Sequence, residues 1–284
     1  MHDFRNLWYL GGQRLLPQHL LSRIAGRLAE AQVPWLRGLL IRAAVRRFGI
    51  DLTEAAEPDC ERYVSFNDFF TRALKAGARP LVGDAQTLVS PADGVISEAG
   101  RLTGNSLLQA KGRTFTLEAL LGESGTRAAG LCDGCFVTIY LSPRDYHRVH
   151  MPLAGTLVAT RYIPGRLFSV NPRTACALPD LYVGNERLVC WFDTPAGTLA
   201  VVLVGALLVA GIDTVWQGRY PPGALREECF ENGEVTLARG AELGRFRFGS
   251  TVIVLVPPGV GLTGAVTGAA VRMGEELARV VPAL

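Results

Sequence analysis

Apolar residues recur at helical spacing near the beginning of this 284-residue chain. From Pro17 onward, one stripe of a predicted helix is formed by Leu20, Leu21, Ile24, Leu28 and Ala31. Pro34 suits the first turn of a second helix, and Gly49 suits its end. The apolar face of that second helix consists of Leu36, Leu39, Leu40, Ala43 and Ala44. The pattern therefore predicts two N-terminal amphipathic helices.

After residue 50 the pattern changes to short apolar runs separated by glycine, proline and polar turns, which is typical of strands. Ser65 is predicted to cap a short helix, and residues 116–122 resemble a capped helical turn. The predicted strands cover residues 136–141, 157–162, 187–192, 199–212 and 252–256. We therefore predict an α+β fold: a region of N-terminal amphipathic helices, residues 1–50, precedes a mostly antiparallel β body, residues 51–284.

The charge distribution suggests which surface the helical region contacts. Residues 1–50 contain eight arginines and two acidic residues, a net charge of +6, whereas the whole chain carries only +3. Such helices either pack on the body as ordinary elements or lie on an anionic membrane surface, and the two roles are compatible. The overall charge is too small to indicate binding to nucleic acid. Residues 199–212, the longest apolar run, are too few to span a bilayer, so we expect peripheral association.

The six cysteines allow two interpretations. Residues 1–3 lack the features of a secretory signal, which favours reduced and mostly buried thiols. Cys132 and Cys135 nevertheless precede His147 and His150, an order that superficially matches a zinc site of two cysteines and two histidines. Only two residues separate the histidines, fewer than the usual spacing of roughly three to five. We therefore expect no metal and keep a zinc-binding structural protein as an alternative.

A Gly–Ser bond, Gly249-Ser250, precedes the apolar run 252–256 and can cleave itself. Ser250 Oγ can attack the Gly249 carbonyl and convert the amide to an ester. β-Elimination then frees the upstream chain and leaves dehydroalanine, which hydrolyses to a pyruvoyl group. The reaction needs a base and an acid that orients the base, and Asp93 and His150 are candidates because triads are recognised by geometry. Residues 248–252 lack the Gly-x-Ser-x-Gly pattern of serine hydrolases.

Five motifs of the chain occur in the order that one family shows. They are Phe66-Asn67-Asp68-Phe69-Phe70-Thr71-Arg72, Ser90-Pro91-Ala92-Asp93-Gly94, Tyr146-His147-Arg148-Val149-His150, Leu167-Phe168-Ser169-Val170-Asn171 and Phe248-Gly249-Ser250-Thr251. Through them, most of residues 60–257 resembles the phosphatidylserine decarboxylase proenzymes, the pyruvoyl-dependent family of phospholipid synthesis. The family's long form usually has leucine where this chain has Phe248. Both residues are apolar, so cleavage is still expected.

The resemblance implies a role for each matching residue. Ser250 resembles the cleavage nucleophile that becomes the pyruvoyl group, so the expected products are chains 1–249 and 250–284. His150 is similar to the triad histidine and Asp93 to the triad aspartate. His147 resembles the histidine used in decarboxylation. The loop that resembles the family's substrate loop contains Phe168, Ser169 and Asn171.

The resemblance also implies a reaction and a location. The expected activity converts phosphatidylserine to phosphatidylethanolamine and CO₂ at the cytoplasmic face of the cell membrane. The expected partners are the phospholipid substrate, an anionic membrane surface and the two chains produced from the precursor, with a homodimer of that two-chain unit left open. An uncleaved pseudoenzyme that binds anionic lipid is the second alternative.

Overall fold

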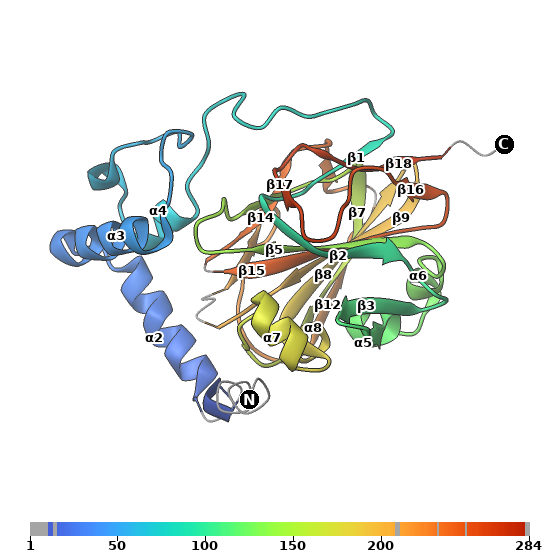
Figure 1. Ribbon diagram of the computed structural model, residues 1–284, viewed down its shortest axis with the longest axis horizontal. Coiled ribbons are helices and arrows are strands. Elements are labelled where there is room, and N and C mark those ends of the chain that lie inside the picture. Colours follow the sequence, from blue (N-terminus) through green and yellow to red (C-terminus); the bar gives the residue numbers. More distant parts are fainter. Residues whose placement is uncertain (1–10, 14–15, 208–210, 232, 248, 282–284) are drawn as a thin grey trace.

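The computed structural model describes residues 11–13, 16–207, 211–231, 233–247 and 249–281. Two long helices, α2 (Gln18–Glu30) and α3 (Pro34–Phe48), lie to one side of a β-rich body (Figure 1). As predicted, α3 begins at Pro34 and is followed by Gly49, which has a φ of 64°. Glycine adopts this left-handed conformation readily because it has no Cβ. The prediction of an α+β fold with N-terminal helices is confirmed.

Both long helices pack through small residues and leave large apolar side chains in solvent. The buried residues of α2 are Gln18, Ser22, Gly26 and Ala29, and those of α3 are Gly38, Ile41 and Ala44. In contrast, Leu20, Ile24 and Leu28 of α2 are 50%, 47% and 47% exposed. On α3, Trp35 is 70% exposed and Leu39 is 54% exposed. Most of the predicted apolar stripe of α2 therefore does not contact the body.

Four of the short helices have side-chain caps, and Asp59 caps the first of them by accepting from the Glu61 amide. The Ser65 hydroxyl accepts a hydrogen bond from the Asp68 amide, as predicted, and Thr116 and Asn171 cap their helices in the same way. In chain order these elements are η1 (Cys60–Arg62), α4 (Phe66–Phe70), α5 (Leu117–Leu121), α6 (Thr126–Ala129), α7 (Pro172–Ala177) and α8 (Leu181–Gly184).

Within the described ranges, the body is built around one nine-stranded antiparallel sheet. Across the sheet the strands are β12 (Arg226–Cys229), β7 (Gly155–Ile163), β8 (Arg187–Thr194), β9 (Gly197–Val204), β15 (Ser250–Val256), β5 (Cys135–Leu141), β2 (Gly94–Arg101) and β17 (Ala270–Val271), with β13 (Thr236–Leu237) paired to β7. The predicted strand at 199–212 is divided, because β9 ends at Val204 and Ile212 begins β10.

Three smaller sheets complete the described part of the body. One contains β11 (Gly218–Tyr220), β10 (Ile212–Thr214), β14 (Glu242–Phe246) and β6 (Arg148–His150). The second contains β1 (Thr87–Val89), β18 (Glu276–Val280) and β16 (Val260–Leu262), and the third is the hairpin of β3 (Ser106–Ala110) and β4 (Arg113–Thr116). The pair β14–β6 places the histidine motif beside the segment that leads to Gly249.

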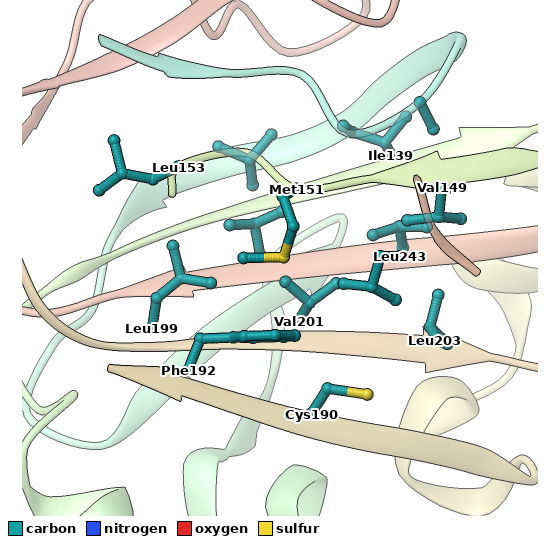
Figure 2. Packing of buried hydrophobic residues seen from close by; sticks show 14 of the residues in the cluster. Ile139, Val149, Met151, Leu153, Cys190, Phe192, Leu199, Val201, Leu203 and Leu243 are labelled. Atoms are coloured by element: carbon teal, nitrogen blue, oxygen red, sulfur yellow. The ribbon is translucent and has the colours of Figure 1, made fainter. Parts of the chain in front are cut away.

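Both faces of the main sheet are covered, which explains the continuous apolar runs of its central strands. In β8, Cys190 and Phe192 belong to the hydrophobic cluster on one face, shown in Figure 2, while Val189 and Trp191 belong to the cluster on the other. β9 and β15 divide their residues in the same alternating way. Every residue of β15 is consequently buried.

A third, smaller cluster attaches the helices to the body. It joins Ile41 and Ala44 of α3 and Ala29 of α2 to the aromatic residues Tyr63, Phe66, Phe69 and Phe70. Ion pairs add to this attachment, since Glu30 at the end of α2 contacts Arg219 of β11 and Arg247, three residues before Ser250. The helical region thus shares a core with residues beyond 50, and the boundary between residues 50 and 51 stays a prediction.

Candidate active site

Ser250 begins β15 at a fully buried position. It pairs with Leu141 of β5, its side chain is 0% exposed, and its Oγ has no hydrogen-bond partner among the described residues. A buried hydroxyl without a partner is costly, so its position at the start of this strand calls for an explanation. A Cβ added to Gly249 would meet only Leu141 O, at 3.9 Å, so there is space beside the bond. Phe248 lies outside the described residues.

His147 is enclosed in an apolar environment. Its Nδ1 donates to Asp145 O at 2.8 Å, so Nε2 carries the lone pair, and Nε2 has no partner in the described part of the chain. The Phe70 ring lies 4.1 Å away between ring centroids. Burial lowers the pKa of His147 to about 3, and the nearby charge of Arg72 acts in the same direction. The backbone amide of Phe246 donates to His147 O at 3.0 Å, which ties this histidine to the segment before Ser250.

His150 is held at both ring nitrogens. Nδ1 donates to Gly240 O at 2.8 Å, so Nε2 accepts from the Tyr146 hydroxyl at 3.0 Å. Burial lowers the pKa of His150 and raises that of Tyr146 to about 12, which keeps the imidazole neutral and the phenol protonated. Sequence reasoning missed Tyr146 as a functional residue, although it stands in the same motif.

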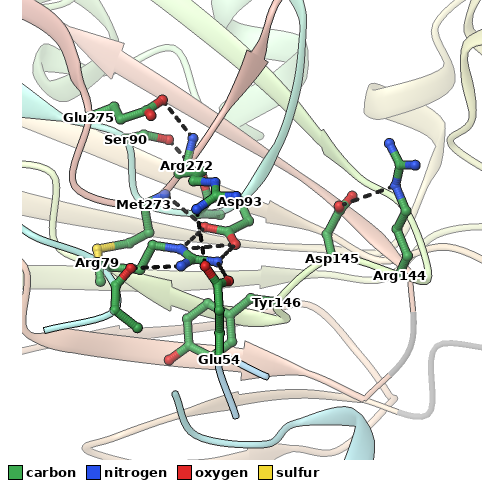
Figure 3. A network of polar contacts seen from close by, with 12 residues as sticks. Glu54, Arg79, Ser90, Asp93, Arg144, Asp145, Tyr146, Arg272, Met273 and Glu275 are labelled. Atoms are coloured by element: carbon green, nitrogen blue, oxygen red, sulfur yellow. Dashed lines mark hydrogen bonds and ion pairs between the residues drawn. The ribbon is translucent and has the colours of Figure 1, made fainter. Parts of the chain in front are cut away.

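Asp93 is neutralised by an arginine. Arg79 donates to both of its oxygens, at distances of 2.5–3.1 Å, and the Met273 amide donates to one of them at 2.8 Å (Figure 3). Arg79 also binds Glu54 at 2.7 Å. No hydrogen bond joins Asp93 to His150 among the residues described, so their direct contact, which the triad prediction implies, is absent here.

Backbone hydrogen bonds nevertheless bring the two motifs together. The His150 amide donates to Pro91 O at 2.8 Å, and the Val89 amide donates to Pro152 O at 2.9 Å. Asp93 and Tyr146 then line the same cleft, which has a volume of about 280 Å³. The turn of Asp93 and the strand of His150 are therefore one structural unit, although 56 residues separate them in the sequence.

The predicted substrate loop is fixed by amide side chains. Gln13 accepts from the Ser169 amide and Gln18 from the Leu167 amide, both at 2.9 Å. Asn185 accepts from the Phe168 amide at 3.2 Å and donates to Phe168 O at 2.9 Å. These bonds attach the loop to α2 and to the segment before β8.

Asn171, at the end of this loop, caps α7. Its side chain accepts from the Thr174 amide at 2.9 Å. The capping bond gives Asn171 a structural role that the family pattern did not indicate.

The alternative zinc site does not form. The structure holds no group of three or more metal-binding side chains among the residues that it describes. Cys135 Sγ instead contacts Val260 O at 3.4 Å, and Cys132 Sγ contacts Ala128 O at 3.7 Å. His147 Nδ1 and both ring nitrogens of His150 bond other groups, as described above. The described residues therefore do not gather the two cysteines and two histidines into one group.

Comparison with known proteins places the chain in a family. A family model described as phosphatidylserine decarboxylase matches residues 66–279, and a second model, described as PSD, matches residues 11–49. The chain belongs to the phosphatidylserine decarboxylase family. The first match includes Asp93, His147, His150 and Ser250, and the second includes all of α2 and α3.

Several curated relatives support this family assignment. A phosphatidylserine decarboxylase proenzyme of Bordetella avium is 50% identical over 276 residues, covering 95% of this chain and 94% of the relative. The proenzyme of Alcanivorax borkumensis is 50% identical over 261 residues, with 90% of each chain covered. That of Azotobacter vinelandii is 52% identical over 252 residues, covering 87% of this chain and 88% of the relative.

In the described residues, no helix has the length and apolarity needed to cross a bilayer.

The buried neutral His147 predicts how the stability of this decarboxylase family member depends on pH. Its pKa of about 3 in the folded protein lies below the value of roughly 6.5 in an unfolded chain, so the unfolded chain binds more protons between these values. The free energy of unfolding should therefore fall as pH decreases through this window, by about 1.4 kcal/mol per unit for such a histidine.

Urea unfolding between pH 4.5 and 6 tests this expectation. His147→Gln should flatten the dependence, whereas His19→Gln, at an exposed position, should leave it unchanged. An equal slope for wild type and His147→Gln would show that His147 is not held neutral.

Proposed function

We propose that this protein decarboxylates phosphatidylserine to phosphatidylethanolamine and CO₂, using a pyruvoyl group formed by self-cleavage between Gly249 and Ser250. The observation that carries the proposal is the Ser250 hydroxyl, buried and without a partner among the described residues, at the start of a central strand. The names of the relatives support the choice of reaction.

Self-cleavage requires only groups that the chain contains, together with water. Ser250 Oγ adds to the Gly249 carbonyl, the amide nitrogen leaves that carbon, and an ester replaces the amide. Loss of the Ser250 α-proton then breaks the bond between Cβ and Oγ. Gly249 leaves as a carboxylate, and residue 250 becomes dehydroalanine, which water hydrolyses to a ketone and ammonia.

His150 is the proposed base for this cleavage. Its Nε2 is already an acceptor, because Nδ1 is committed to Gly240 O. To take the Ser250 proton, Nε2 exchanges the Tyr146 hydroxyl for the serine hydroxyl. Asp93 is proposed to support His150 through the turn that binds the His150 amide, and through its negative charge, which favours the protonated imidazole.

The position of β15 suggests that the two product chains stay together. β15 is hydrogen-bonded on one side to β5 and on the other to β9, and all its residues are buried. Removing a central strand would expose both faces of the sheet to water, at a large cost in free energy. We therefore propose that chains 1–249 and 250–284 form one stable unit.

The ketone would accept the substrate amine and serve as the sink for the electrons released when CO₂ departs. His147 has a suitable atom for the proton transfers. Its neutral Nε2 can take the proton of the substrate ammonium and later return a proton to the carbon that lost CO₂. The apolar contact with Phe70 limits water at this histidine. Phe168, Ser169 and Asn171 are retained as proposed substrate-loop residues, held in place by the amide network.

The exposed apolar residues of α2 and α3 support peripheral attachment to an anionic membrane surface, proposed to be the cytoplasmic side of the cell membrane. Leu20, Ile24 and Leu28 are joined by Trp35 and Leu39 in a group of large, solvent-exposed apolar side chains on two adjacent helices. Arg46 and Arg47 are exposed near the end of α3. We call Leu20, Ile24, Leu28, Trp35 and Leu39 the apolar face of the helices.

Maturation provides the most direct test. Purified protein should separate under denaturing conditions into chains 1–249 and 250–284, and the intact mass of the smaller chain should match a pyruvoyl terminus. That chain should resist N-terminal sequencing because it begins with a ketone. Ser250→Ala should remain one chain, since no hydroxyl is left to attack, while Ser142→Ala serves as the control. Wild-type protein that stays one chain after long incubation would favour the lipid-binding pseudoenzyme.

The two histidines should separate the two reactions. We expect His150→Ala to slow cleavage at least about 100-fold, because general-base catalysis commonly contributes that much. His147→Ala should still mature but lose decarboxylation by a similar factor. Gel analysis of maturation and release of ¹⁴CO₂ from carboxyl-labelled phosphatidylserine measure the two steps. Normal decarboxylation by His147→Ala would show that another group carries out the proton transfers.

Membrane binding should depend on the apolar face of the helices even at high salt. The double variant Trp35→Ser/Leu39→Ser should bind vesicles of phosphatidylglycerol at least about tenfold more weakly, because inserting one large apolar side chain contributes about 1.5–3 kcal/mol. Val266→Ser, at a position that is 63% exposed in the body, is the matched control. Co-sedimentation at 0.05 and about 0.5 M salt gives the comparison. Unchanged binding of the double variant would assign the membrane contact to another surface.

A further inference from the structure

A cavity with a volume of about 670 Å³ lies where α2 meets the body. One wall consists of the α2 residues His19, Ser22, Arg23, Gly26, Arg27 and Glu30. The opposite wall comes from the end of β7, the beginning of the proposed substrate loop, β11 and Glu186. None of the site residues proposed above lines it. We call this space the α2 cavity.

Glu186 gives the α2 cavity a buried carboxyl group. The residue is only 3% exposed, its carboxyl group lies beside the Tyr162 hydroxyl, and it forms no ion pair with any described residue. The side chains of its two neighbours are hydrogen-bonded to the backbone. Asn185 bonds Phe168 and Gly205, and the buried Arg187 donates to four backbone carbonyl oxygens. Burial raises the pKa of Glu186, although Tyr162 and His19 favour its charged form. A carboxylate in such a place is stabilised by a nearby cation, and among the described residues only His19 acts on Glu186 in this way.

The position of Glu186 is closely fixed. Its amide donates to Arg166 O at 2.9 Å, and its carbonyl accepts from the Gly205 amide at 2.8 Å. A Cβ added to Gly165 would lie 2.6 Å from the Glu186 amide nitrogen, so the loop can approach this closely only with glycine there. The backbone that carries Glu186 is therefore held between the substrate loop and the end of β9.

The α2 wall of the cavity carries the opposite charge. Arg23 and Arg27 are exposed and form no ion pair with the part of the chain that the structure describes, whereas Arg219 is already paired with Glu30 and Asp213. Ser22, which is 4% exposed, lines the same wall, and its Oγ has no hydrogen-bond partner among the described residues. The cavity thus combines a buried carboxyl group with two arginines that form no ion pair, and a hydroxyl that has no hydrogen-bond partner, among the described residues.

We propose that the α2 cavity binds the headgroup of an ethanolamine phospholipid, with the ammonium at Glu186 and the phosphate at Arg23 and Arg27. The choice of ligand follows from the charges, because a headgroup of this kind carries its cation and its anion a few bonds apart. A serine headgroup has an additional carboxylate, which Glu186 would repel. The site therefore selects the product type of headgroup over the substrate type.

The exposed apolar side chains of α2 favour a lipid over a free zwitterion as the ligand. The helix that supplies Arg23 and Arg27 also carries Leu20, Ile24 and Leu28 of the apolar face. If that face lies in the membrane, the arginines of the same helix stand at the depth of the headgroups. The assignment to an ethanolamine lipid rests on the proposed function, since that lipid is the proposed product.

Binding to the Ser250→Ala protein tests the site without any reaction at residue 250. The probes are dihexanoyl phosphatidylethanolamine, dihexanoyl phosphatidylserine and dihexanoyl phosphatidic acid, each as a monomer in solution, measured by calorimetric titration. Phosphatidylethanolamine should bind most tightly. Adding Glu186→Gln, which preserves size and shape, should weaken that binding at least tenfold and leave phosphatidic acid unchanged, while Glu234→Gln, an exposed acidic control, should change neither.

A second variant examines the phosphate end of the site. Arg23→Gln/Arg27→Gln alters two exposed residues and should weaken all three lipids at least tenfold. Thermal unfolding of each variant verifies the fold. The proposal is overturned if phosphatidylethanolamine binds no better than phosphatidic acid, if it binds no better than phosphatidylserine, or if Glu186→Gln leaves its affinity unchanged. Failure of wild-type protein to mature would overturn the proposed function instead, because these titrations use a chain that lacks Ser250.

Discussion

The pairing of β15 between β5 and β9 is the constraint on which the rest of the structure depends. All seven residues of this strand pair with β5, the five from Thr251 to Leu255 also pair with β9, and none is exposed. The strand carries Ser250 into a dry position while the preceding strand, β14, is held beside the histidine motif of β6. A flexible surface loop could not hold a serine hydroxyl in this way, because water would satisfy and shield it.

Burial also sets the protonation state of the site. Both His147 and His150 have depressed pKa values, and each donates from Nδ1 to a backbone carbonyl. Each therefore presents Nε2 as a proton acceptor at neutral pH. In contrast, Asp93 lies against Arg79, and its connection to His150 runs through the backbone of a turn. The structure thus holds Asp93 in an ion pair while both histidines stay neutral.

The N-terminal helices combine two surfaces that are usually found on different elements. Their small residues face the body, so the helix axes come close to it, and their large apolar residues face outward. Gln13 and Gln18 hold the substrate loop, and Glu30 contacts Arg247 near the cleavage position. A change in the position of α2 would consequently alter the contacts of both the loop and the segment before Gly249. These contacts connect the proposed membrane surface to the proposed site.

The sequence by itself determined the local features. The ends of α3 at Pro34 and Gly49, the Ser65 cap and the approximate strands follow from backbone preferences and periodicity, which act over a few residues. The motifs also identified the family, because their order needs no coordinates. Tertiary structure decided which groups meet: Tyr146 with His150, Arg79 with Asp93, and Glu186 with the α2 cavity. It also decided that α2 packs through Ser22 and Gly26, since burial depends on distant residues that periodicity does not describe.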